Sequence, residues 1–280
     1  MVSQMEKFRT FQALHDRRGA FVMPNAWDAG SARMLAHLGF EAIATTSAAY
    51  AFSAGKRDSF AGLSRDEILE NAAAIVGACA LPVSADLEDG FGAAPKACGE
   101  TVRLALDLGL VGGAIEDATG DDGCPIYEFD IAVERIAAAV EAAADKPFLV
   151  TARAENYLYG RPDLGDTIRR LQAFSEAGAD VLYAPGLPDL EAIQTVCREV
   201  DRPVNVVMGL SGLQATVREL SEAGVARIST GGSLARAGWG AVWRAAQEML
   251  ESGSFSYASE AMPDADMARL MSQEKTDRRD

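Results

Sequence analysis

The sequence contains few of the residues that bind soft metal ions or build disulfide frameworks. It has only two histidines, and its four cysteines, Cys79, Cys98, Cys124 and Cys197, are scattered over 280 residues without a Cys-x-x-Cys pair. This distribution argues against a structural zinc site and against a fold held together by disulfides. Any metal site is therefore expected to use oxygen ligands.

Long apolar runs and an excess of positive charge are also missing. No run of about 18 apolar residues occurs, so no membrane span is expected, and the N-terminal segment lacks the apolar core of a signal peptide. The net charge of −15 disfavours binding to nucleic acid or anionic membranes. We expect a cytoplasmic protein with a small-molecule partner. An anionic substrate would need local positive charge from a metal ion or a buried arginine.

Short apolar segments alternate with amphipathic segments of helical length along most of the chain. This alternation predicts βαβ units and a parallel sheet. Eight units in a chain of this size favour a (β/α)8 TIM barrel over an open doubly wound sheet. We expect one catalytic domain over residues 1–250 and a polar C-terminal extension over 251–280, which either contacts a partner or is disordered at its end. The predicted strands are 20–24, 41–46, 82–87, 111–117, 147–153, 180–186, 203–208 and 226–232.

Capping signals support these boundaries. Ser64, with Glu67 three residues later, is typical of a capping box that begins a helix. A glycine directly before several predicted strands is typical of a helix that ends in a left-handed residue. These glycines are Gly39, Gly109, Gly178 and Gly224.

Acidic residues follow two neighbouring predicted strands. In the segment VSADLEDGFG, Asp86 and Glu88 share one strand face, and Glu116 ends the next strand. Active sites of such barrels lie at the carboxyl ends of the strands. Carboxylates crowded there repel one another, and a hard cation, Mg²⁺ or Mn²⁺, would relieve the repulsion. Asp89 and Asp117 are out of phase, which predicts loop or supporting roles. The alternative is that all these acids cap helices or are solvated.

One arginine is predicted to join this cluster. The strand 147–153 ends in Thr-Ala-Arg, which places Thr151 and Arg153 on the face that points into the barrel mouth. A guanidinium there would bind a carboxylate in a bidentate manner, or would pair with one of the acids. A metal ion together with an arginine indicates a site for a small 2-oxo acid or its enolate.

The chain resembles the isocitrate lyase/phosphoenolpyruvate mutase superfamily from about residue 10 to 250. The resemblance implies a (β/α)8 barrel that binds Mg²⁺ and a 2-oxo acid. It also implies a homo-oligomer, usually a tetramer, whose subunits exchange the last helix. The matching segments are MPNAWDAGSARMLAHLGFEAIATTSAAYA, GKRDSFAGLSRDEIL, ADLEDGFG, AIEDATGDDGCP, VTARAENYL and PVNVVMG.

The resemblance also implies roles for single residues. The family's acidic metal ligands match Asp86, Glu88 and Glu116, although the family normally has Asp where this chain has Glu88. The family's loop aspartate matches Asp58, and either Asp58 or Tyr50 would handle a proton. The expected substrate-binding residues are Ser47, Ala48, Arg153 and Asn205.

The branch of the family is less clearly marked. Cys124 aligns with the catalytic cysteine of the lyases, but its neighbours, DDGCPIY, lack the bases that would lower a thiol pKa, so its role as an acid catalyst is open. Cys98 is expected to be a small buried residue in a helix. The gating loop of the phosphonate enzymes is missing too. The segment STGGSLAR could hold a phosphate, but a tight turn before a helix is favoured.

The main functional hypothesis is therefore a Mg²⁺-dependent carbon–carbon lyase or decarboxylase that acts on a small 2-oxo or 2-hydroxy carboxylate through an enolate. One alternative is a phosphonate mutase or hydrolase that uses the same site. The other is a barrel that binds a 2-oxo acid without turning it over.

Overall fold

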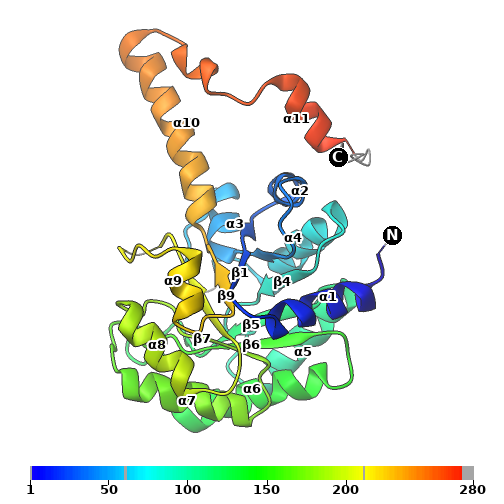
Figure 1. The fold of residues 1–280 in the computed structure, drawn as a ribbon, viewed down its shortest axis with the longest axis vertical. Helices are drawn as coiled ribbons and strands as arrows, with labels where there is room; N and C mark the ends of the chain where they lie inside the picture. The colour runs from blue at the N-terminus through cyan, green and yellow to red at the C-terminus, as the bar shows by residue number, and fades with distance from the viewer. Residues whose placement is uncertain (1, 60–61, 211, 273–280) are drawn as a thin grey trace.

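The computed structural model describes residues 2–59, 62–210 and 212–272. Its centre is a parallel sheet that curves into a (β/α)8 barrel, as predicted (Figure 1). The strands are β1 (Phe21–Met23), β2 (Asn25–Ala26), β3 (Ile43–Thr45), β4 (Val83–Asp86), β5 (Gly112–Glu116), β6 (Leu149–Arg153), β7 (Val181–Tyr183), β8 (Val204–Val207) and β9 (Arg227–Ser229).

The barrel closes through a single extended segment that Pro24 divides into β1 and β2. Proline has no backbone N–H to donate to a neighbouring strand. On one side β1 pairs with β9, and on the other β2 pairs with β3. The carbonyl of Pro24 still accepts a hydrogen bond of 2.9 Å from the N–H of Ala44. The predicted strand 20–24 is thus the first strand of the barrel, and the alternative of an open sheet is wrong.

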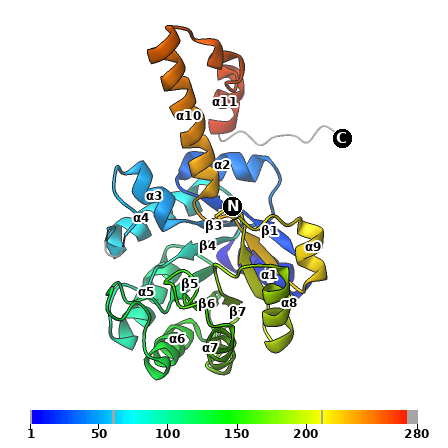
Figure 2. The ribbon, with the colours of Figure 1, turned by 90° about the vertical axis from the view of Figure 1, so that its left-hand side faces the viewer.

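Helices surround the barrel and cover the outer face of the sheet (Figure 2). Apolar side chains from the strands and helices form one large core between these two layers. The helices that follow the strands are α2 (Ala29–His37), α3 (Ser47–Ser53), α4 (Arg65–Ala78), α5 (Pro95–Asp107), α6 (Phe129–Ala143), α7 (Leu164–Glu176), α8 (Leu190–Glu199) and α9 (Val217–Glu222).

The capping predictions agree with these boundaries. Ser64 accepts from the backbone N–H of Glu67, and the Glu67 side chain accepts in return from the N–H of Ser64, which completes the capping box at α4. The four predicted C-terminal glycines all have left-handed backbones, with φ between 86° and 100°. Glycine adopts this conformation without the steric cost of a Cβ atom.

Helix α1 (Gln4–Asp16) closes the amino end of the barrel. Phe11 is fully buried and packs edge-on against Phe21 and His15. Around it lie Leu14 from α1 and residues at the starts of strands, including Leu149. The floor of the barrel is therefore sealed, and the opposite, carboxyl end is the open one.

The C-terminal part leaves the barrel. Helix α10 (Ser233–Ser252) projects away from it, and the chain then returns through the 3₁₀ helix η1 (Ser256–Ser259) to α11 (Asp264–Met271) (Figures 1 and 2). Helix α11 lies against α2, where the Arg33 guanidinium donates to the Met271 carbonyl. The end of the C-terminal extension was expected either to contact a partner or to be disordered. Its residues 273–280 lie outside the described residues.

No helix in residues 2–59, 62–210 or 212–272 is both long enough and apolar enough to cross a membrane.

Candidate active site

A cavity of about 650 Å³ opens at the carboxyl ends of the strands. It reaches down into the barrel as far as Met23 and Ser84. Eight of the residues predicted from sequence line it: Ser47, Ala48, Asp58, Asp86, Glu88, Glu116, Arg153 and Asn205. The fold thus gathers in one cavity residues that are up to 158 positions apart in the sequence (Ser47 to Asn205).

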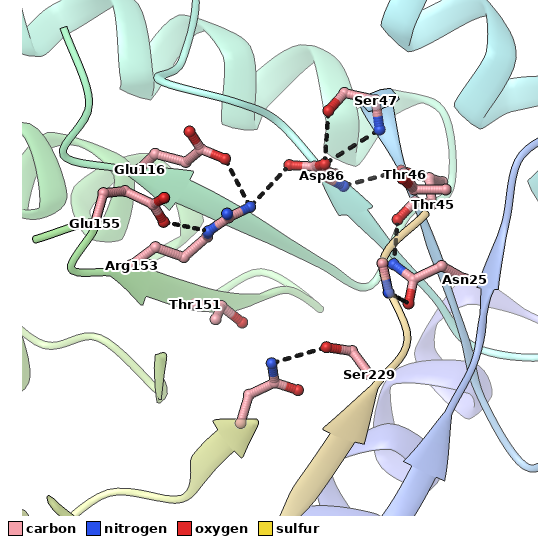
Figure 3. A network of polar contacts seen from close by, with 12 residues as sticks. Asn25, Thr45, Thr46, Ser47, Asp86, Glu116, Thr151, Arg153, Glu155 and Ser229 are labelled. Atoms are coloured by element: carbon pink, nitrogen blue, oxygen red, sulfur yellow. Dashed lines mark hydrogen bonds and ion pairs between the residues drawn. The ribbon is translucent and has the colours of Figure 1, made fainter. Parts of the chain in front are cut away.

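Arg153 lies at the centre of the cavity wall and contacts three carboxylates (Figure 3). Its Nη1 atom is 2.7 Å from Glu116 Oε1 and 3.3 Å from Asp86 Oδ1. Its Nε atom donates to Glu155 Oε1 at 2.8 Å. The guanidinium also lies over the ring of Tyr183, 4.9 Å from its centroid. One positive charge therefore faces three negative ones, and the cluster carries an excess of negative charge.

Asp86 is held from its other side by the end of β3 and the start of α3. Its Oδ2 atom accepts hydrogen bonds from the Ser47 hydroxyl at 2.8 Å and from the Ser47 N–H at 3.1 Å (Figure 3). The Thr45 hydroxyl accepts from the N–H of Asp86 at 2.9 Å. These bonds fix the orientation of the carboxylate before any ligand arrives. Ser47 was predicted to bind substrate, and here it contacts Asp86.

Glu88 and Asp58 add two further carboxyl groups to the cavity. Burial, together with the neighbouring charge of Asp86, raises the pKa of Glu88 to about 8. Asp58 lies at the rim of the cavity, where partial enclosure of its carboxyl and the charge of Asp86 raise its pKa. Burial likewise raises the pKa of Glu116, although Arg153 opposes the shift. Glu88, Asp58 and Glu116 are thus less acidic than free side chains, mainly because they are buried.

Glu88 reaches the cavity differently from the way strand alternation predicts. Strand β4 ends at Asp86, and Glu88 has a left-handed backbone with φ of 49°. The turn continues through Gly90 (φ 83°) and Phe91 (φ 61°). Because non-glycine residues rarely adopt positive φ, the surrounding contacts must hold this turn in place.

Two buried arginines hold the loops that carry the acids. Arg135 of α6 lies 3.4 Å from Asp89 and donates to the carbonyls of Gly92 and Ala93 at 2.6 and 2.7 Å. These contacts fix the turn after β4. Asp89 therefore has the supporting position expected of an out-of-phase acid.

Arg170 of α7 fixes the segment that follows β5. It donates to Asp117 Oδ2 at 3.0 Å and to the Tyr127 carbonyl at 2.9 Å. The other oxygen of Asp117 accepts from the N–H of Glu155 at 2.8 Å. Burial raises the pKa of Asp117 to about 7, against the effect of Arg170. Asp117 thereby positions Glu155, which in turn holds Arg153.

Tyr50 and Cys124 are not among the described residues that line the cavity. Tyr50 is partly buried on α3 and packs against the cluster of Ala51, Leu63 and Ile68. The thiol of Cys124 donates to the Ile126 carbonyl, with an Sγ to O distance of 3.5 Å. Neither residue contacts the acids here, and the catalytic roles suggested for them remain predictions.

Cys98 was expected to be a small buried residue, and the segment STGGSLAR (229–236) was expected to form a tight turn before a helix. The structure agrees with both expectations. Cys98 is fully buried on α5, and burial raises the pKa of its thiol to about 11. The backbone N–H groups of Thr230 and Gly231 both donate to Asn25 Oδ1 at 2.9 Å. These two donors are therefore engaged within the chain, as in a turn that precedes helix α10.

The described side chains do not form a ready-made metal cage. No group of three or more His, Cys, Asp or Glu residues in the described part of the chain converges as metal ligands would. Arg153 lies between Asp86 and Glu116 and occupies the space between their carboxylates.

Sequence reasoning missed Glu155, Arg135, Arg170 and Tyr183. Glu155 carries a weak signal, since it lies two residues after Arg153, just beyond the end of the same strand. The two helical arginines carry none, because a buried arginine and a solvated one look alike in a helical pattern.

The family model described as phosphoenolpyruvate phosphomutase matches residues 11–250. The chain belongs to this family, within the isocitrate lyase/phosphoenolpyruvate mutase superfamily.

Three similar proteins illustrate the range of the superfamily. A Burkholderia cenocepacia structure described as a "putative lyase/mutase" is 56% identical, covers 95% of each chain and has a TM-score of 0.93. The 2-methylisocitrate lyase of Escherichia coli is 30% identical over 50% of this chain and 48% of its own. The oxaloacetate decarboxylase of Pseudomonas aeruginosa is 28% identical over 70% of this chain and 69% of its own.

Arg170→Met should destabilise the protein by about 3–5 kcal/mol, because it leaves the buried Asp117 carboxylate without its cation. Arg169→Met is the matched control, since this neighbouring arginine pairs with Asp166 on the surface with 69% of its side chain exposed. Its loss should cost at most about 1 kcal/mol. Urea unfolding measures both values, and equal effects would contradict the supporting role of Arg170.

Proposed function

We propose that this protein is a metal-dependent carbon–carbon lyase or decarboxylase that acts on a small 2-oxo or 2-hydroxy carboxylate through an enolate. The observation that carries the proposal is the cluster in which the single guanidinium of Arg153 faces Asp86, Glu116 and Glu155. Membership of the superfamily supports enzymatic activity on small carboxylates.

The donor set suits a hard divalent cation. Asp86, Glu88 and Glu116 offer only oxygen atoms, and Glu88 and Glu116 have raised pKa values because they are buried without enough positive charge. We propose that these three residues hold Mg²⁺ or Mn²⁺, directly or through water. When bound there, the cation supplies a Lewis acid for the oxygen that becomes negative in the enolate.

The residues of the chain have separate tasks in such a reaction. Arg153, held by Glu155 and lying over Tyr183, is placed to bind the substrate carboxylate. In a decarboxylation, the bond from C3 to its carboxylate breaks and CO₂ leaves. The electron pair moves into the enolate, and C3 then takes a proton. Asp58, whose pKa is raised at the rim of the same cavity, is the candidate proton donor.

A phosphonate mutase or hydrolase is the second candidate. The matching family model carries the name of a phosphomutase, and an enolate of pyruvate is common to both chemistries. The two candidates differ in the bond that breaks, so they differ in the product that is released. A barrel that binds such an acid without turnover would release neither product.

The direct test offers oxaloacetate, 2-methylisocitrate, isocitrate and phosphonopyruvate to the protein with Mg²⁺ or with EDTA. We expect metal-dependent release of pyruvate or glyoxylate, and a loss of at least about 100-fold in Asp86→Asn because the central carboxylate is gone. Asp107→Asn, an exposed acid on α5, should keep full activity.

Phosphate release from phosphonopyruvate would instead support the second candidate. No product from any substrate, with oxalate still raising the melting temperature in Mg²⁺, would support binding without turnover.

We further propose that a second copy of the chain covers α10 and the segment after it. Large apolar side chains are exposed there, with Trp243 68%, Leu250 86% and Phe255 65% accessible. Patches of this kind on a folded protein are typical of interaction sites. A homo-oligomer, expected from the family resemblance to be a tetramer, would bury them.

Light scattering after gel filtration should show an oligomer for the unmodified protein. The double substitution Trp243→Glu and Leu250→Glu should shift it toward smaller species, because it places charge in the apolar contact. Leu104→Glu, at an exposed apolar position on α5, is the matched control and should leave the mass unchanged. A monomeric unmodified protein would refute the proposal.

A further inference from the structure

Arg227, the first residue of β9, is a buried cation with only neutral partners. Its side chain lies inside the barrel, and the residue is 2% exposed. Its Nε atom donates to Asn205 Oδ1 at 2.8 Å, and its Nη2 atom donates to Thr151 Oγ1 at 3.0 Å. Its Nη1 atom lies 3.4 Å from His15 Nε2. No carboxylate of residues 2–59, 62–210 or 212–272 forms an ion pair with it.

His15 contributes no compensating charge. Its Nδ1 atom lies 2.8 Å from the Phe11 carbonyl. A carbonyl can only accept, so Nδ1 carries the proton and Nε2 offers its lone pair to Arg227. Burial and the neighbouring charge of Arg227 lower the pKa of His15 to about 3, which keeps the ring neutral. The Arg227 site therefore retains a full positive charge.

The other enclosed arginines of the barrel have carboxylate partners. Arg135 pairs with Asp89, Arg170 with Asp117, and Arg153 with Asp86, Glu116 and Glu155. Removing a charge from water is costly unless an opposite charge compensates for it. Arg227 differs from the other three because no carboxylate in the described part of the chain provides such a charge. A ligand that brings a negative charge would supply it.

The same cavity contains Arg227 and the acid cluster. Cross-strand pairing places Glu116, Arg153, Tyr183, Asn205 and Arg227 in register from β5 to β9, and all five line the cavity. Residues in register across a sheet point to the same face. The row therefore runs from an acidic end at Glu116 to a basic end at Arg227. Thr151 accepts a hydrogen bond from Arg227, and Ser229 accepts one from Asn205. Both residues lie below Arg153 in Figure 3.

We infer that Arg227 binds a second carboxylate of the substrate, which makes the substrate a small dicarboxylate. This inference rests on the proposed function, in which the 2-oxo or 2-hydroxy end of the molecule lies at the acidic end of the cavity. A guanidinium has five N–H donors, and the three contacts of Arg227 use three of them. Two donors are left for a carboxylate.

Asn205 keeps this end of the cavity specific for an anion. Its Nδ2 atom donates to the Ser229 hydroxyl at 3.0 Å, which fixes its Oδ1 atom toward Arg227. The guanidinium is thereby held from both sides. An apolar group placed against it would leave its remaining donors unpaired, which disfavours substrates that end in a methyl group.

The test compares two ligands that differ only at the distal end, malate and 2-hydroxybutyrate, by calorimetry with Mg²⁺ present. We expect the unmodified protein to bind malate roughly 10- to 100-fold more tightly, the range of one charged hydrogen-bonding contact. Arg227→Gln should abolish this preference and leave the affinity for 2-hydroxybutyrate largely unchanged. Arg236→Gln is the control, because Arg236 is an exposed arginine that lines the same cavity at its rim. It should retain the preference.

Three results would overturn the inference. One is equal binding of the two ligands by the unmodified protein, which requires no variant. Another is a full malate preference in Arg227→Gln. The third is loss of the preference in Arg236→Gln alone, which would place the second carboxylate at the rim. If Arg227→Gln does not fold, the comparison of malate with 2-hydroxybutyrate on the unmodified protein still tests the inference.

Titrations repeated in EDTA separate this inference from the proposed function. If the metal binds the 2-hydroxy acid end that malate and 2-hydroxybutyrate share, EDTA should weaken the binding of both ligands to a similar degree. Binding that is insensitive to EDTA, with the malate preference retained, would contradict the proposed metal site and leave the assignment of Arg227 standing.

Discussion

The contact of Arg153 with Asp86, Glu116 and Glu155 is the interaction on which the rest of the site depends. Acids from two other strand ends and from the loop after β6 meet at one guanidinium, so the barrel must hold these elements in register. The outer contacts serve this arrangement. Arg170 holds Asp117, Asp117 holds Glu155, and Ser47 holds Asp86. Glu88 and Asp58 add two more carboxyl groups, so the acidic side chains of the cluster outnumber the single guanidinium of Arg153.

The two sides of the cavity carry opposite charge. Negative charge collects at β4, β5 and β6, whereas the opposite wall carries Arg227 among neutral partners. A ligand that combines a chelating acid at one end with a carboxylate at the other would match both walls. Helix α1 closes the amino end of the barrel, so a ligand can reach the cavity only through the open carboxyl end. Binding and chemistry are thus confined to the side of the barrel that also bears Asp58.

The sequence predicted the barrel and the order of its strands, because hydrophobic alternation and capping residues report local structure directly. Strand alternation also placed Asp86, Glu116 and Arg153 at the cavity, whereas Ser47 and Asp58 were placed there by the family resemblance. Gly39 and Ser64 are examples in which one residue marks a boundary correctly. Strand alternation failed at Glu88, where the chain leaves β4 and turns with positive φ. The buried arginines could not be predicted, since their role depends on distant residues such as Asp89 and Asp117. The predicted first strand ends at Pro24, and the short strand β2 that follows it was not predicted.

The most direct test of the account is Mn²⁺ binding, followed by the loss of the paramagnetic resonance signal of free Mn²⁺. The account predicts one bound ion per chain, a dissociation constant at least about tenfold weaker in Asp86→Asn, and no change in Asp107→Asn. Failure of the unmodified protein to bind Mn²⁺, or equal affinity in Asp86→Asn, would contradict the claim that the acids around Arg153 form a cation site.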